Sequence, residues 1–214
     1  MCGEQAEKRQ FAFMSENYPK MNSEPDMFQT VMDLVKTQRP DKGVDQEDCR
    51  RQTIATLAAT AGYENPEQIA KEVLDVFLEE RNKIHLYEGV PQMLQSLKDK
   101  GIKLGSITNG TADTNKTVLK DLIPFCIQAG KLGKPKPDPT SFREALSLTG
   151  TDPSVTVHVG DNLLNDVLAP QKLGMRVVWF NSSKEKRPDS HKDAEIDSEV
   201  HTIAELAQVL ESWC

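Results

Sequence analysis

Residues 155–166 read VTVHVGDNLLND, a strand-length run that ends in a glycine and an aspartate before a polar loop. The pattern predicts a buried strand over 155–159. In an open α/β sheet, ligands bind beyond the carboxyl ends of the strands, so Asp161 and Asp166 lie where a site can form. Their carboxylates suit Mg²⁺, which keeps several waters and needs few protein ligands. The alternative is that Asp166 or Asn165 only caps the next helix; the position after the strand favours the site.

The chain after Leu86 alternates between strand-like and helix-like segments. Such alternation argues for a parallel sheet covered by helices, so the expected fold class is α/β. The expected strands are 102–107, 125–127, 155–159 and 176–180. The expected helices are 91–100, 114–122, 140–148 and 165–173, followed by a loop at 181–198 and a last helix that Thr202 and Glu205 cap.

The chain before Leu86 shows helical apolar patterns and no convincing strand. Three helices are expected, the first starting near Ser23, the second opened by Asp45 and Asp48, and the third by Asn65 and Pro66. These patterns predict a small helical bundle over residues 1–86 and an α/β core over residues 87–214.

Composition limits the classes of partner. The net charge is -7 and the sequence pI is about 5.2, so neither nucleic acid nor an anionic membrane surface is expected to bind. The longest apolar runs are strand-sized and the first residues have no signal-peptide pattern, so we expect a cytoplasmic protein. The scattered cysteines Cys2, Cys49, Cys126 and Cys214 form no C-x-x-C pair, which fits a reducing compartment.

A second polar group, Thr108-Asn109-Gly110, directly follows the expected strand 102–107. A hydroxyl, an amide and a flexible glycine at a strand end can donate several hydrogen bonds to a phosphoryl oxygen. Taken alone, a turn that leads into a helix is the more favoured interpretation.

A third group centres on Lys136, in the segment Lys136-Pro137-Asp138-Pro139. A lysine braced by prolines can hold a cation where it neutralises phosphate charge. A solvated basic turn is the alternative, and Lys131 and Lys134 are rival candidates nearby.

The order of these groups closely resembles motifs II, III and IV of the haloacid dehalogenase superfamily. The matching segments are 106–110 (SITNG), 136–142 (KPDPTSF) and 158–166 (HVGDNLLND), with further typical stretches at 86–90 and 174–181. The resemblance covers roughly residues 13–181. It implies a Rossmann-like parallel sheet with helices on both faces, and a helical cap of the kind inserted after motif I.

The resemblance also implies roles for the candidate residues. Thr108 and Asn109, with Gly110, would bind the phosphoryl group of a small phosphate ester. Lys136 would be the catalytic lysine of motif III, because it directly precedes Pro-Asp-Pro. Asp161 would bind Mg²⁺, and Asp166 would bind it through water or support the site from behind.

The chain departs from the family pattern because it contains no Asp-x-Asp. Family enzymes carry this motif I at the end of a central strand, and its first aspartate is the nucleophile. We therefore expect no nucleophile in this chain, an N-terminally incomplete or alternative form, and little or no turnover. A missing central strand would also expose sheet edges, which invites self-association or a strand from a partner chain.

The leading hypothesis is a Mg²⁺-dependent phosphomonoesterase for a small phosphorylated metabolite, inactive or nearly so in this form. The alternative is a non-catalytic protein of the same fold that binds phosphate esters or a partner chain. Dehalogenation also occurs in the superfamily, but it needs no metal, and Gly160-Asp161 speaks against it.

Overall fold

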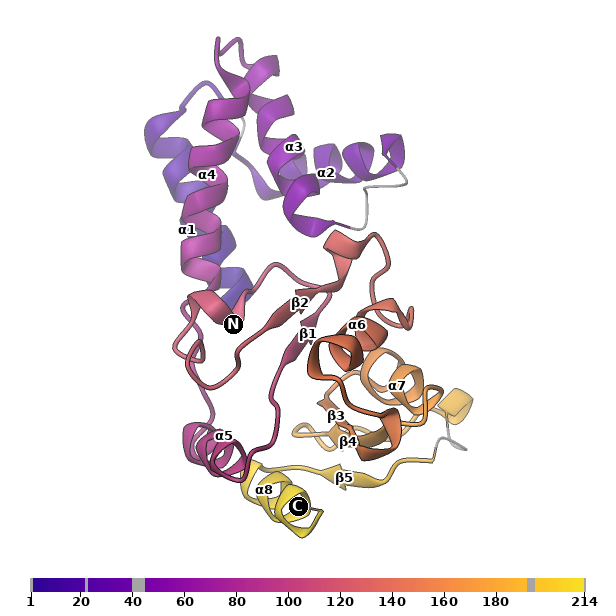
Figure 1. Cartoon of the computed structure of the whole chain (residues 1–214). Helices are drawn as coiled ribbons and strands as arrows, with labels where there is room; N and C mark the ends of the chain where they lie inside the picture. The colour runs from indigo at the N-terminus through magenta and orange to yellow at the C-terminus, as the bar shows by residue number, and fades with distance from the viewer. Residues whose placement is uncertain (1, 22, 40–44, 192–194, 214) are drawn as a thin grey trace. The chain divides into compact units, whose positions relative to one another are not determined.

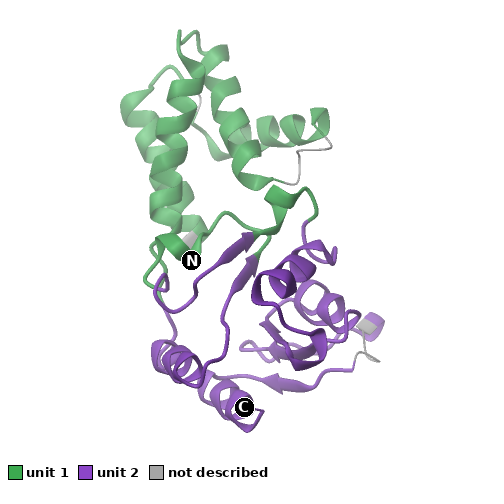
Figure 2. Cartoon of the chain, in the orientation of Figure 1, with its two compact units in different colours: residues 1–85, 108–118, 128–134 green, residues 86–107, 119–127, 135–214 purple. Residues whose placement is uncertain are grey.

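The computed structural model describes residues 2–21, 23–39, 45–191 and 195–213. The chain divides into two compact units, shown in green and purple in Figure 2. Unit 1 comprises residues 1–85, 108–118 and 128–134, and unit 2 comprises residues 86–107, 119–127 and 135–214. Two short segments from the second half of the chain thus belong with the N-terminal helices.

Unit 1 is built mainly from helices α1 (Cys2–Asn17), α2 (Pro25–Gln38), α3 (Gln46–Thr60) and α4 (Pro66–Arg81), which Figure 1 labels. Helices α1 and α3 pack along α4, and α2 packs on α3. Asp45 caps α3 by accepting hydrogen bonds from the backbone N–H groups of Glu47 and Asp48 at 3.0 and 3.2 Å. The helices expected from the three apolar patterns are therefore confirmed.

Helix α1 precedes the three expected helices, and its buried residues explain why it forms. Ala6 and Met14 are fully buried, and both belong to one apolar cluster with residues of α2, α3 and α4. Packing against α4 stabilises this helix, since most helical stability in proteins comes from a buried face.

The sheet of unit 2 has helices on both faces, as the sequence predicted. Its strands β3 (Val157–Gly160), β4 (Arg176–Phe180) and β5 (Ser198–Val200) pair in parallel, with β4 in the middle. Successive side chains of a strand point to opposite faces. Val178 accordingly packs with residues of α5 (Val90–Asp99) and α8 (Ile203–Ser212), whereas Val177 packs with the residues that follow β3.

A second, two-stranded sheet pairs β1 (Ser106–Thr108) with β2 (Cys126–Gln128). In the described part of the chain, this sheet and the β3–β4–β5 sheet are separate. All residues of β3 are only half-buried, whereas the three central residues of β4 are buried. Strand β3 thus has the burial of an edge strand.

Some elements differ from the sequence prediction. Residues 114–122 were expected to be helical, but only Thr114–Lys116 form a helical turn, of 3₁₀ type. The helix expected over 165–173 begins earlier, as a π-helical segment at Leu163–Leu168 that leads into α7 (Ala169–Gln171). Helix α6 (Thr140–Thr149) agrees with its expected bounds within a residue. Strand β5 was not expected.

Within the described residues, no helix combines the length and the apolar character that crossing a membrane requires. Cys49 is buried and Cys126 is half-buried. Cys214 and the side chain of Cys2 lie outside the described part of the structure.

Candidate functional site

Lys136 is the best-enclosed of the candidate lysines. Its side chain is 9% exposed, against 46% for the rival Lys131. The ammonium group donates to the backbone carbonyl of Ile107 at 3.0 Å and to Asp166 Oδ1 at 2.5 Å. The structure thus fixes one cation at the carboxyl end of β1.

Asp166 is the buried partner of that lysine, with its side chain 8% exposed. Its Oδ2 accepts from the backbone N–H of Asn162 at 3.1 Å, and His158 Nε2 lies 3.5 Å from Oδ1. Burial opposes ionisation of Asp166, but the hydrogen bonds from His158 and Lys136 outweigh it and lower the pKa to about 2. Both carboxylate oxygens therefore already have protein partners, which fits a supporting position behind the site.

Asp161 directly follows β3 and its residue is exposed. Among the described residues, its carboxylate has no hydrogen-bond or ion-pair partner, while its backbone carbonyl accepts from Trp179 Nε1 at 2.9 Å. A carboxylate left open at the end of a strand is available to a cation. No group of three or more His, Cys, Asp or Glu side chains that could hold a metal ion occurs in the described chain. Mg²⁺ fits this donor set, because it commonly takes one or two carboxylates and completes its shell with water and phosphate oxygens.

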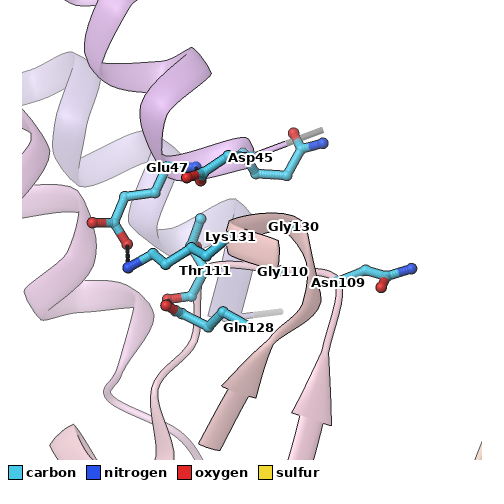
Figure 3. Close-up of a pocket in the computed structure, with 9 residues that line it drawn as sticks. Asp45, Glu47, Asn109, Gly110, Thr111, Gln128, Gly130 and Lys131 are labelled. Carbon is cyan, nitrogen blue, oxygen red and sulfur yellow. Dashed lines mark hydrogen bonds and ion pairs between the residues drawn. The ribbon is translucent and has the colours of Figure 1, made fainter. Parts of the chain in front are cut away.

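The segment Thr108-Asn109-Gly110 belongs to unit 1 rather than unit 2. The backbone N–H of Gly110 donates to Thr108 Oγ1 at 2.9 Å, so this turn is closed by its own hydroxyl. The hydroxyl proton of Thr108 remains able to donate to a ligand, since the oxygen acts only as acceptor in that bond. Figure 3 shows the Asn109 side chain extending away from the other side chains around it.

The segments that follow this turn and strand β2 make polar contacts within unit 1. The backbone N–H of Asp113 donates to Asn82 Oδ1 at 2.9 Å, at the end of α4. Gln128 Nε2 donates to the Thr111 carbonyl at 2.9 Å, and Lys131 pairs with Glu47 at 2.9 Å (Figure 3). A cavity of about 10 Å³, room for roughly one water, lies among residues Asp45, Gln46, Glu47, Asn109, Gly110, Thr111, Gln128, Gly130 and Lys131.

The candidate residues thus fall into two sets. The structure brings Lys136 and Asp166 into direct contact and places Asp161 on the same short segment as Asp166. Thr108, Asn109 and Gly110 form a closed turn in unit 1. Chemically, the first set offers a fixed cation and an open carboxylate on the segment that follows β3, and the second set offers a hydroxyl donor.

Sequence reasoning missed two residues that support these sets. Trp179 Nε1 donates a hydrogen bond to the Asp161 carbonyl, and Asn82 Oδ1 accepts one from the Asp113 N–H. Neither belongs to a local motif, because each partner is distant in the chain. A strand tryptophan whose N–H needs an acceptor was the available signal for Trp179.

Comparison with known proteins finds a matching family model and a similar solved structure. Residues 21–180 match the family model described as haloacid dehalogenase-like hydrolase. The crystal structure of a 2-haloacid dehalogenase from Pseudomonas syringae pv. Tomato is 32% identical in sequence, with a TM-score of 0.90 over 100% of this chain and 92% of that chain.

Curated relatives include phosphatases. A phosphoserine phosphatase from Thermus thermophilus is 30% identical over 133 residues, which is 59% of this chain and 53% of the relative. A glyceraldehyde 3-phosphate phosphatase from Methanopyrus kandleri is 29% identical over 130 residues, 58% of this chain and 56% of the relative. The chain therefore spans about half the length of these two relatives.

Proposed function

Because the chain belongs to the haloacid dehalogenase-like hydrolase family, we propose that it carries the site of a Mg²⁺-dependent phosphomonoesterase for a small phosphorylated metabolite. The buried ion pair of Lys136 with Asp166, with the open carboxylate of Asp161 on the same segment, is the observation that supports this most directly. The four scattered cysteines, which form no C-x-x-C pair, fit a cytoplasmic location.

Each residue has a separate task in this proposal. Lys136 neutralises charge on the phosphoryl group, and Asp166 holds the lysine in place through their ion pair. Thr108 and Asn109, with Gly110, donate hydrogen bonds to phosphoryl oxygens. Asp161 holds Mg²⁺, which would neutralise phosphate charge when bound.

Covalent catalysis is the part of the family chemistry that these residues do not supply. No Asp-x-Asp occurs among the 214 residues, so no aspartate stands in the motif from which the family draws its nucleophile. Loss of a nucleophile costs several orders of magnitude in rate, so we expect binding of phosphate and Mg²⁺ with little turnover.

The test measures binding and turnover separately. Titration calorimetry with Mg²⁺ and with inorganic phosphate should show binding that Asp161→Asn weakens for Mg²⁺ and Lys136→Met weakens for phosphate. The exposed Asp121→Asn is the matched control for removal of a carboxylate. Phosphate release from p-nitrophenyl phosphate should stay near background. Absence of binding in the wild type would refute the proposed site, and rapid turnover that Asp161→Asn abolishes would refute the expected inactivity.

Dehalogenation is a second candidate, because the Pseudomonas syringae structure carries that name. Halide release from 2-chloropropionate, measured without Mg²⁺, separates the two reactions. Halide release that survives removal of divalent metal would favour dehalogenation over phosphate chemistry.

A third candidate is a non-catalytic protein that binds a partner strand. The two sheets are separate in the described chain, and β3 is half-buried along its length. Unpaired backbone groups at such an edge can pair with another chain. Size-exclusion chromatography over a concentration series tests this, since a protein that stays monomeric at high concentration does not pair with itself in this way.

A further inference from the structure

Trp179 packs against the segment that follows β3 and forms a hydrogen bond with it. It lies on β4 opposite Gly160 in the parallel register, and its residue is 4% exposed. Its ring belongs to an apolar cluster with Val167, against which Leu163 also packs. The indole is therefore fixed between the sheet and the helical segment that comes after Asp161.

The indole N–H donates to the backbone carbonyl of Asp161 at 2.9 Å. A buried indole N–H needs an acceptor, so this bond satisfies both groups. Because the peptide unit is planar, fixing the orientation of the Asp161 carbonyl also fixes ψ of Asp161. The direction in which the Asp161 side chain leaves the backbone is thereby restricted.

The residues after Asp161 are held by different bonds. The backbone N–H of Asn162 donates to Asp166 Oδ2 at 3.1 Å, and Asn162 Oδ1 accepts from the Asn165 N–H at 2.9 Å. A methyl group on Gly160 would come within 2.4 Å of the Asp166 side chain, so that side chain lies directly on the Gly160 backbone. The segment is thus clamped at Asp161 by Trp179 and at Asn162 by Asp166.

We propose that Trp179 is a positioning residue for Asp161, and that its N–H, rather than its bulk, orders the cation-binding end of the segment. The role toward Mg²⁺ rests on the proposed function, whereas the ordering of the segment does not. A phenylalanine at this position keeps an aromatic ring in the cluster but leaves the Asp161 carbonyl without its donor.

Hydrogen exchange measured by mass spectrometry tests the ordering directly. In Trp179→Phe, exchange of residues 161–166 should become roughly three- to tenfold faster, the factor expected from one lost hydrogen bond. Exchange of α6 should not change. Mg²⁺ affinity, measured by calorimetry, should fall by a similar factor.

Two control variants distinguish the effect of losing the indole N–H from that of a general loosening of the sheet. Val178→Ala removes a fully buried side chain from the same strand on the opposite face, and Trp213→Phe removes an indole elsewhere in unit 2. Neither should accelerate exchange of 161–166 relative to α6. If Trp179→Phe does not accelerate it, or does so no more than Val178→Ala, the positioning role is wrong. If the wild type does not bind Mg²⁺, the proposed function fails, while the exchange comparison still decides the role of Trp179.

Discussion

The helices of unit 1 and the strands of unit 2 complete their cores in different ways. In unit 1, one apolar cluster joins all the helices, and Ile54 and Val73 are fully buried. In unit 2, the buried apolar residues form separate small clusters, and β3 is half-buried. A helix satisfies its own backbone hydrogen bonds, whereas a strand needs neighbours on both edges. A helical bundle can therefore complete its core with its own residues, whereas a sheet depends on the elements that lie beside it.

The largest expected difference comes from apolar truncation in the two regions. Phe77 of α4 is 4% exposed, and the Arg50 guanidinium lies 3.9 Å from its ring centre. Phe77→Ala should lower the free energy of unfolding of the bundle by about 3–5 kcal/mol. Val159→Ala, in half-buried β3, should lower that of unit 2 by less than about 1.5 kcal/mol. Urea denaturation followed by circular dichroism and by tryptophan fluorescence measures both losses, and equal losses would contradict the proposed difference between the two cores.

Two lysines, one in each unit, form ion pairs that differ in burial. Lys136→Met leaves Asp166 buried without its ammonium partner and should destabilise unit 2 by about 3 kcal/mol. Lys131→Met removes a pair with Glu47 whose side chains are 46% and 27% exposed, and should cost less than about 1 kcal/mol. Thermal unfolding measures both changes. A loss for Lys131→Met as large as that for Lys136→Met would contradict the difference in burial.

The free energy of unfolding of unit 2 should also depend on pH. The pKa of Asp166 is lowered from 3.8 in the unfolded chain to about 2 in the fold. Its contribution to the free energy of unfolding is therefore present above the unfolded pKa and is lost as the pH falls through the folded pKa. About 2 kcal/mol should disappear between pH 4 and pH 2. Denaturation of the wild type and of Asp166→Asn at several pH values checks this, because the variant should lack that part of the pH dependence.

The smallest expected effect separates two helix starts within unit 1. Asp45 caps α3 with side-chain hydrogen bonds, whereas Asn65 precedes α4 without one. Asp45→Ala should cost about 1 kcal/mol and Asn65→Ala a few tenths. Thermal unfolding resolves the two. A larger loss for Asn65→Ala would show that this asparagine contributes by a route other than capping.

The helices were predictable because their signals are local. Asp45 and the prolines near helix starts mark the first turns, and the apolar spacing marks the buried faces. Helix 114–122 was predicted wrongly, since the β-branched Thr117 and Val118 disfavour a helix and Thr117 is extended. Strand β5 was missed because Ser198-Glu199-Val200 shows little apolar alternation. These residues form a strand because they pair with β4.

The candidate site was predictable only in part. A lysine followed by Pro-Asp-Pro distinguished Lys136 from its neighbours, and its roles and those of Thr108, Asn109, Gly110 and Asp161 remain predictions. The sequence could not show that Asp166 would be bonded to Lys136, because 30 residues separate them. It could not show Trp179 beside Asp161 either, since that contact depends on the register of β3 with β4.

The path of the chain between the two units affects how the protein can be divided. Residues 108–118 and 128–134 belong to unit 1, although segments of unit 2 flank them on both sides. A protease that cuts once after His85 would leave these segments on the C-terminal fragment, so neither product would be an intact unit. Excising the helical unit as a single piece would require joining three separate stretches of the chain, so no truncation at one site can produce it.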